Sequence, residues 1–260
     1  MAGELTDAYT RSGAAWARGP ARIYDRMAEV LVDRAPVPLA GRLVLDVGAG
    51  TGAASRAVRR AGGTPVACDL AIGMLTAAGV DRPPAAVADA RHLPFARASV
   101  DAVVAAFSFN HLPDPEVALA GSAHVTRPGG FVLVSAYSRD DDHPVKAAVS
   151  QAVVEAGWEG AAWYDDVRHD AIPRLATPGA AVAAARAAGL EQAHAEAVDV
   201  SFPELAARDL VAWRMGMAHV APFVDAGGPA RRAHLEARAL ELLGDAPPLV
   251  RKMVVLSVVV

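Results

Sequence analysis

The sequence holds a single cysteine, Cys68, so no disulfide can form within the chain. We expect Cys68 to be a small buried residue of a strand rather than a reactive thiol, in a reducing cytoplasm. The sequence also lacks the roughly 20 consecutive apolar residues that span a bilayer, and its first residues lack the basic and then apolar pattern of a signal peptide. These absences argue against a secreted disulfide scaffold and against integral membrane association.

Positive charge is not in excess either. The 260 residues include 25 Lys and Arg against 29 Asp and Glu, a formal net charge of −4, so no general field favours nucleic acid or anionic membranes. With 53% hydrophobic and 21% charged residues, the composition is that of a folded protein with a substantial core.

Apolar, β-branched runs alternate with helical patterns through the first half of the sequence. We predict strands at 42–47, 64–69, 85–88, 100–106 and 129–137, and helices near 52–61, 71–79 and 114–126. A helix near 178–188, a strand near 194–202 and a closing strand at 254–260 extend the pattern. Alternating strands and helices favour an α/β fold with a doubly wound, mostly parallel sheet.

We expect residues 1–260 to form one domain that consists of a core and added helical segments. We expect a helical N-terminal cap at 1–40, a cofactor-binding core at 41–137, and helical lid insertions at 139–175 and 203–245 that shape the substrate site. The acidic run Asp140-Asp-Asp-His143 is expected to be a solvated loop that caps a helix beginning at Pro144. We predict no metal site in that run.

A strand that ends in Asp46 and a glycine-rich turn is the strongest local signal. In Leu43-Val-Leu-Asp-Val-Gly48-Ala-Gly50-Thr-Gly52, three glycines at alternate positions lead into an Ala-rich helix. Glycine lets the backbone turn sharply and approach a ligand closely, and the helix N-terminus favours a carboxylate or phosphate. The spacing by itself also satisfies the loose dinucleotide fingerprint.

Acidic residues at three successive strand ends distinguish a dinucleotide from a cofactor that has no pyrophosphate. Asp46 ends the first strand, Asp69 ends the second, and Asp89 follows the third. Such acids suit a ligand with an amine and nucleoside hydroxyls but no pyrophosphate. A short-chain nicotinamide dehydrogenase would also need a Tyr-x-x-x-Lys pair, which is absent from the sequence.

The pattern as a whole resembles the class I S-adenosylmethionine (SAM)-dependent methyltransferases, in the small-molecule branch similar to the ubiquinone-biosynthesis methyltransferases. The matching segments are Leu45–Gly52, Cys68–Leu75, Ala88–Phe95, Val100–Asp114 and Arg127–Phe131. The resemblance implies a Rossmann-like, seven-stranded sheet whose last strand is antiparallel.

The resemblance also assigns cofactor contacts by position. It implies that the methionine part of SAM meets Asp46 and the turn Gly48, Ala49, Gly50, Thr51 and Gly52. The ribose hydroxyls would meet Asp69, and the adenine would meet Leu70, Met74, Asp89 and Ala90. The sulfonium would be bordered by Ala106 and Phe107. The aromatic residues that are candidates to close over the cofactor are Tyr9, Trp16 and Tyr24.

We therefore expect methyl transfer to an oxygen, nitrogen or carbon of a small, apolar metabolite, with SAM as cofactor. His111 follows the fourth strand and is the candidate general base. Two alternatives stay open: a SAM-binding protein of this fold that catalyses a cyclisation or rearrangement, and a non-enzymatic SAM-binding protein. The expected partner is a small molecule and not nucleic acid, and the expected state is a monomer or homodimer.

Overall fold

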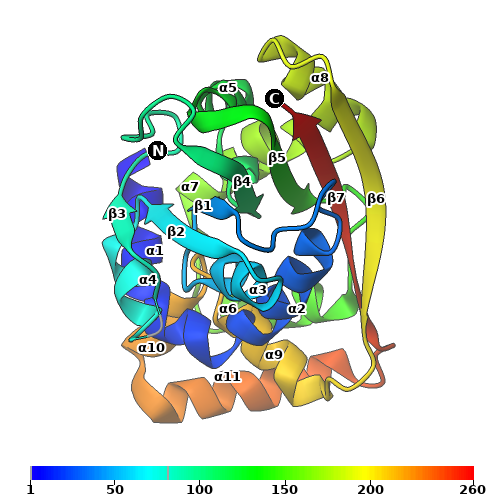
Figure 1. The fold of residues 1–260 in the computed structure, drawn as a ribbon. Helices are drawn as coiled ribbons and strands as arrows, with labels where there is room; N and C mark the ends of the chain where they lie inside the picture. The colour runs from blue at the N-terminus through cyan, green and yellow to red at the C-terminus, as the bar shows by residue number, and fades with distance from the viewer. Residues whose placement is uncertain (1, 81) are drawn as a thin grey trace.

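The structure is a computed structural model that describes residues 2–80 and 82–260; Met1 and Asp81 lie outside the described residues, so the expected cap at 1–40 is described from residue 2. The described chain forms a seven-stranded sheet with strand order β3-β2-β1-β4-β5-β7-β6 (Figure 1). The strands are β1 (Leu43–Val47), β2 (Thr64–Asp69), β3 (Ala85–Val87), β4 (Val100–Ala106), β5 (Thr126–Tyr137), β6 (Ala193–Phe202) and β7 (Leu249–Val259).

β7 is antiparallel to both of its neighbours, β5 and β6, whereas the other strand pairs are parallel. The predicted doubly wound sheet with an antiparallel last strand is thus confirmed. β7 begins at Leu249, earlier than the predicted 254, and this added length lets it pair with the whole of β6.

β5 begins at Thr126, before the predicted 129, because Arg127-Pro-Gly-Gly130, which has the composition of a turn, lies inside the strand as a wide bulge. Val100 pairs with Thr126 and Ala102 with Phe131, so residues 127–130 all stand opposite Asp101. Gly130 is needed there because an added Cβ would lie 2.4 Å from the carbonyl oxygen of Asp101.

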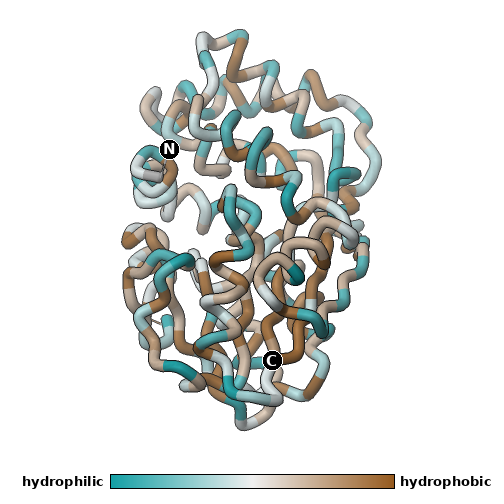
Figure 2. Tube along the Cα trace, turned by 90° about the horizontal axis from the view of Figure 1, so that it is seen from above, coloured by the Kyte–Doolittle hydropathy of each residue, from teal (hydrophilic) through white to brown (hydrophobic). Residues whose placement is uncertain are grey.

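Helices cover both faces of the sheet, and the alternation of side chains along each strand builds a separate core under each layer. Val44 and Leu133 pack in one core, and their neighbours Leu45 and Val134 in the other. The first core lies under α2 (Pro20–Val32), α3 (Ala53–Arg60), α6 (Pro144–Glu155), α9 (Ala207–Met215) and α11 (Gly228–Leu243), and the second under α5 (Pro115–Val125) and α8 (Pro178–Ala187). In Figure 2 the hydrophobic segments gather in the interior and the hydrophilic ones toward the outside.

The remaining elements are short helices and turns. They are α4 (Ile72–Ala77), α7 (Ala162–Asp166), α10 (Ala221–Ala226), a π-helical turn (Val167–Ala171) and the 3₁₀ turns Phe109–His111 and Ile172–Arg174. None of the helices in the described part of the chain has both the length and the apolarity to cross a membrane.

The N-terminal cap consists of two helices, α1 (Ala2–Arg18) and α2, which meet at Gly19. An added Cβ at Gly19 would lie 2.3 Å from the carbonyl oxygen of Ala212, so glycine allows the chain to bend against α9. α1 lies against α4 over a contact just as close: an added Cβ at Gly73 would lie 1.9 Å from the carbonyl oxygen of Thr10. The cap is therefore held tightly beside the end of β2.

Candidate active site

A cavity of about 1030 Å³, open to solvent, lies at the carboxyl ends of β1, β2 and β4, with α1 and α2 as its outer wall. The position is that at which open α/β sheets bind ligands. The structure brings nearly all of the predicted site residues to this cavity: Tyr24, Asp46, Gly48, Ala49, Gly50, Thr51, Asp69, Leu70, Met74, Asp89, Ala90, Ala106, Phe107 and His111.

Gly52 is the exception, because it does not line the cavity. It stands at the N-cap of α3 with φ +88°, and its glycine character serves to turn the chain into the helix. Gly48 has a different reason: at φ +70°, an added Cβ would lie 2.3 Å from the Cβ of Ser108. Gly50 is also left-handed, at φ +56°, so the three glycines serve two purposes: a left-handed backbone and a close approach between β1 and the segment after β4.

Asp46 lies at the bottom of the cavity and is fully buried. Its Oδ2 accepts a hydrogen bond from Ser55 Oγ at 2.6 Å, whereas its Oδ1 has no hydrogen-bond partner among the described residues. Burial raises the pKa of Asp46 to about 6, although Ser55 opposes the shift. An unpaired carboxylate oxygen in a cavity wall is suited to receive an ammonium group.

Asp69 fixes the glycine turn to the end of β2. Its Oδ2 accepts from the backbone N–H of Gly50 at 2.7 Å, and its Oδ1 accepts from the backbone N–H of Ala71 at 2.8 Å. Burial raises the pKa of this carboxyl, and the backbone hydrogen bonds oppose the rise. Since each carboxylate oxygen has two acceptor positions, Asp69 keeps capacity for a pair of hydroxyls.

Asp89 is held by its own loop. Arg91 approaches it with Nε at 3.1 Å and Nη2 at 2.8 Å, and this pairing lowers the pKa of the Asp89 carboxyl. The carboxylate is therefore ionised and oriented at the cavity wall. Sequence reasoning did not identify Arg91 as its positioning partner, although it lies only two residues further on.

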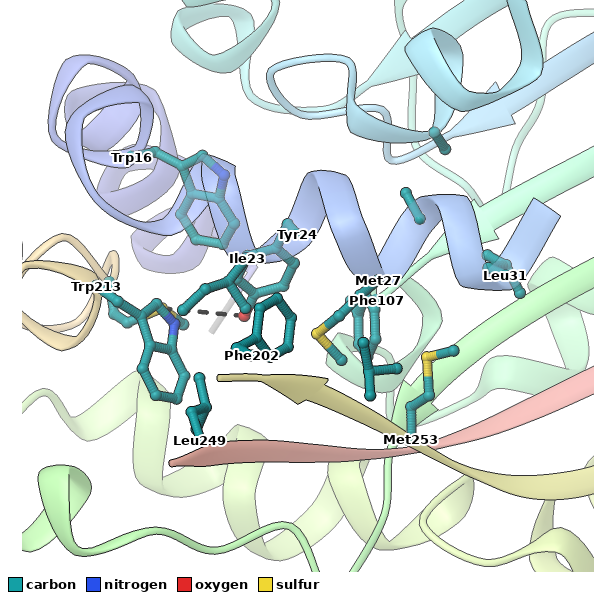
Figure 3. Close-up of a cluster of buried hydrophobic side chains, with 14 of the residues drawn as sticks. Trp16, Ile23, Tyr24, Met27, Leu31, Phe107, Phe202, Trp213, Leu249 and Met253 are labelled. Atoms are coloured by element: carbon teal, nitrogen blue, oxygen red, sulfur yellow. Dashed lines mark hydrogen bonds between the residues drawn. The ribbon is translucent and has the colours of Figure 1, made fainter. Parts of the chain in front are cut away.

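Aromatic side chains form the outer wall, among them Trp16, Tyr24 and Phe107, which also belong to the buried cluster drawn in Figure 3. The rings of Trp16 and Tyr24 have centroids 4.7 Å apart, and those of Tyr24 and Phe107 meet edge to face at 5.5 Å. Phe107 has φ +54°, a strained backbone conformation for a residue with a Cβ. Such strain at the end of β4 is typical of a functional position.

His111 faces the cavity, but its ring is already engaged. Tyr9 donates its hydroxyl to Nε2 at 2.9 Å, and Nδ1 lies 3.3 Å from the carbonyl oxygen of Ser108. Burial lowers the pKa of His111 to about 4. Tyr9 and Trp16 also line the cavity, as do Leu5, Thr6, Ser108 and Leu112, which sequence reasoning did not single out.

The expected lid segments lie one layer behind this wall. Within the described chain, no residue of 139–175 or 203–245 lines the cavity; instead Trp163 contacts Tyr9 with ring centroids 6.2 Å apart, and Met217 Sδ accepts from Tyr24 Oη at 3.9 Å. The surface of the cavity that faces these segments is made by α1 and α2.

The expectation of a solvated loop at 140–143 is wrong for Asp141. Both oxygens of this buried carboxylate lie 2.9 Å from Arg251, with Oδ1 toward Nε and Oδ2 toward Nη2, because β7 passes directly beneath the loop. The predicted cap of α6 is present, but His143 makes it, through Nδ1 and the backbone N–H of Val145. In the described part of the chain, no cluster of three or more His, Cys, Asp or Glu residues is placed to hold a metal ion.

Comparison with known proteins agrees with this geometry. Residues 45–134 match the family model of a methyltransferase domain. A demethylmenaquinone methyltransferase of Clavibacter sepedonicus is 35% identical over 143 residues, which are 53% of this chain and 57% of that protein. The chain thus aligns with a little over half the length of that relative.

Two solved structures extend the likeness to the fold of nearly the whole chain. The methyltransferase bound to the Haloferax volcanii Trm112 methyltransferase activator is 21% identical, with a TM-score of 0.57 over 98% of this chain and 97% of that one. The [4+2]-cyclase SpnF is 20% identical, with a TM-score of 0.54 over 90% of this chain and 80% of that one. Residues 45–134 are accordingly a methyltransferase domain, and the chain has the fold of the class I SAM-dependent methyltransferases.

Proposed function

We propose that the protein transfers the methyl group of SAM to an oxygen, nitrogen or carbon of a small, apolar metabolite. The observation that supports this most directly is Asp46, whose buried Oδ1 has no partner among residues 2–80 and 82–260 although Asp46 lines the cavity. The ammonium of an amino-acid-bearing cofactor would satisfy it. The capacity of Asp69 to accept from two hydroxyls and the oriented carboxylate of Asp89 complete a set of acceptors that suits an amine-bearing nucleoside without pyrophosphate.

When bound, SAM supplies a methyl group already activated on a sulfonium, so the chain's own work is alignment and exclusion of water. Asp46 would hold the amino group, Asp69 the ribose hydroxyls and Asp89 the adenine amino group. Phe107 and Tyr24 close the cavity beside Ala106. Alignment of this kind can contribute ~7–11 kcal/mol to lowering a barrier.

His111 can serve as an anchor for α1 as well as a candidate base. Its Nε2 is occupied by Tyr9, so the imidazole anchors α1 over the cavity and takes up a proton from the acceptor only after Tyr9 moves away. The low pKa keeps the ring neutral at pH 7 and also makes it a weak base. Anchoring is the role that the contacts favour.

The apolar acceptor is proposed from the aromatic wall, and the name of the demethylmenaquinone methyltransferase relative points the same way. We further propose that 139–175 and 203–245 shape the acceptor site once the wall of α1 and α2 opens, and that the protein acts as a monomer or homodimer.

Two measurements test the proposal. Titration calorimetry must show SAM binding that Asp69→Ala weakens at least about tenfold, the effect of losing a charge-assisted pair of hydrogen bonds. Turnover of an acceptor must release one S-adenosylhomocysteine for each product. If SAM binds and product forms without S-adenosylhomocysteine, the cyclase-type alternative is correct; if SAM does not bind, the proposal fails.

A further inference from the structure

A second group of polar side chains lies behind the Tyr24–Phe107 wall. Arg251 and Lys146 pair with Asp141, and Arg214 is linked to Arg251 through the ring of Trp213; both arginines are buried, with less than a tenth of their surface exposed. The guanidinium carbon of Arg251 lies 4.5 Å from the centre of the Trp213 ring, and that of Arg214 lies 5.5 Å from the same ring. The indole of Trp213 therefore joins the two cations.

Asp141 cannot neutralise this group. Its Oδ1 accepts from Arg251 Nε and from the backbone N–H of Lys252, both at 2.9 Å. Its Oδ2 accepts from Arg251 Nη2 and from Lys146 Nζ, also at 2.9 Å. The carboxylate is saturated by four donors from Arg251, Lys146 and the backbone of Lys252, so it has no acceptor position left for Arg214.

Three buried donors remain without a partner in the described chain: Arg251 Nη1, Arg214 Nε and Trp213 Nε1. No carboxylate in the described chain lies within 4 Å of the Arg214 guanidinium. Buried donors, and charged ones above all, are normally paired. A surplus of positive charge together with three unpaired donors is the arrangement expected where an anionic oxygen binds.

The cluster adjoins the proposed methyl-transfer site through two contacts. Phe107, which lines the cavity, stacks on Tyr137 with ring centroids 4.9 Å apart, and the guanidinium carbon of Arg251 lies 5.3 Å from the centre of the same Tyr137 ring. The hydroxyls of Tyr24, which lines the cavity, and of Tyr137 are hydrogen-bonded to each other. Figure 3 shows Trp213 beyond Tyr24, away from Phe107.

We propose that Arg214, Arg251 and Trp213 form the recognition site for an acidic oxygen of the methyl acceptor, a carboxylate or phenolate on an otherwise apolar ring. This rests on the proposed function and specifies its substrate class. The acceptor lies with its ring against Phe107 and Tyr137 and its anionic group toward the unpaired donors. Tyr24 and Tyr137 then exchange their mutual hydrogen bond for contacts with the acceptor.

The test uses a matched pair of probes in the presence of S-adenosylhomocysteine: naphthalene-2-carboxylate and naphthalene-2-carboxamide, with 2-naphthol at high pH as the phenolate arm. Calorimetry is expected to show that the carboxylate binds at least about tenfold more tightly than the carboxamide. Arg214→Gln is expected to weaken carboxylate binding about thirtyfold and carboxamide binding by less than about threefold. Tighter binding of the phenolate than of the carboxylate would assign the oxygen as phenolic.

Arg208→Gln is the control, because Arg208 lies on the same helix with its side chain exposed, and it should change neither probe. Trp213→Phe removes one donor and keeps the ring packing, so it tests the site without removing a charge. Three results would overturn the inference: equal binding of carboxylate and carboxamide, no binding of either probe, or carboxylate binding that Arg214→Gln does not change. SAM binding measured on the same samples shows separately whether the proposed function stands.

Discussion

The hydroxyl of Tyr9 donates to Nε2 of His111 across 2.9 Å, joining the first helix to the segment after β4. Burial raises the pKa of Tyr9 well above its usual range, so the phenol keeps its proton and acts as the donor. Burial also lowers the pKa of His111, so the imidazole stays neutral, and because its Nδ1 donates to the carbonyl oxygen of Ser108, Nε2 is the acceptor. Both groups are thus in the neutral form that this hydrogen bond needs, and the bond holds α1 over the cavity.

We predict that Tyr9→Phe and His111→Phe have nearly the same effect, since both remove this hydrogen bond and keep an aromatic ring. Loss of about 1 kcal/mol of hydrogen-bond energy corresponds to a roughly fivefold weaker SAM affinity. Calorimetric SAM binding and steady-state kinetics check this. A kcat loss of ~10²–10⁴-fold in His111→Phe alone would instead identify His111 as a general base.

SAM affinity should depend on pH through Asp46. Burial raises the pKa of Asp46 to about 6, and only the ionised form can pair with the cofactor's ammonium. Affinity should therefore be constant above about pH 7 and fall by up to about tenfold for each pH unit below 6, because binding must then expel a proton. Calorimetry between pH 8 and pH 5 measures this directly.

Two variants delimit that pH effect. Asp46→Asn should bind SAM at least about tenfold more weakly at pH 7.5 and lose the Asp46 part of the decline below pH 6, which leaves only the contribution of Asp69, whose pKa burial also raises. Asp89→Asn is the matched control, since Arg91 lowers the pKa of Asp89 and its ionisation lies below the measured pH range. It should bind more weakly but keep the wild-type pH profile. A pH profile that survives in Asp46→Asn would assign the effect to another group.

The contact between α1 and α4 should control access to the cavity. In Gly73→Ala the new Cβ would meet the carbonyl oxygen of Thr10 at 1.9 Å, so α1 has to move away from α4. Overpacking of this kind costs about 1–3 kcal/mol. We expect faster amide hydrogen exchange across residues 2–18 and weaker SAM binding.

Gly3→Ala is the control for that change. Gly3 lies on α1, the helix whose exchange is measured, and no described atom lies within 4 Å of its added Cβ. This variant should leave exchange unchanged or slow it slightly, since alanine favours helix. Unaltered exchange in Gly73→Ala would show that α1 is not held by this contact.

The core of the fold and the cavity could be predicted from sequence because their signals are local. β1, the glycine turn and Asp46 lie within ten residues of one another, and the alternation of strands and helices implies where their ends meet. The bulge in β5 was missed because Arg127-Pro-Gly-Gly130 has the composition of a turn, and only its pairing opposite Asp101 shows that the strand continues.

The environment of Asp141 could not be predicted for a different reason. Its partner Arg251 lies 110 residues further along the chain, on a strand inserted between β5 and β6. A run of three aspartates before a histidine has the local appearance of a solvated loop. Only the antiparallel placement of β7 beneath that loop converts its middle residue into a buried ion-pair partner.

Asp141 also provides the clearest stability prediction. In Asp141→Asn the cations Arg251 and Lys146 lose their counter-charge inside the fold, and removal of one partner from a buried pair costs about 3–5 kcal/mol. Urea denaturation at pH 7 measures this loss. Asp140→Asn, an exposed neighbour, is the matched control and should change the free energy of unfolding by less than about 0.5 kcal/mol.

The same carboxylate should govern stability in acid. Burial would raise the pKa of Asp141, but Arg251 and Lys146 outweigh it and lower the pKa to about 2. Because the unfolded pKa is near ~3.9, the unfolded chain binds the proton first, so the contribution is complete above about pH 4 and is lost as the pH falls toward 2. The wild-type Tm should therefore approach that of Asp141→Asn between pH 4 and pH 2, and parallel Tm curves over this interval would show that the ion pair does not form in the folded protein.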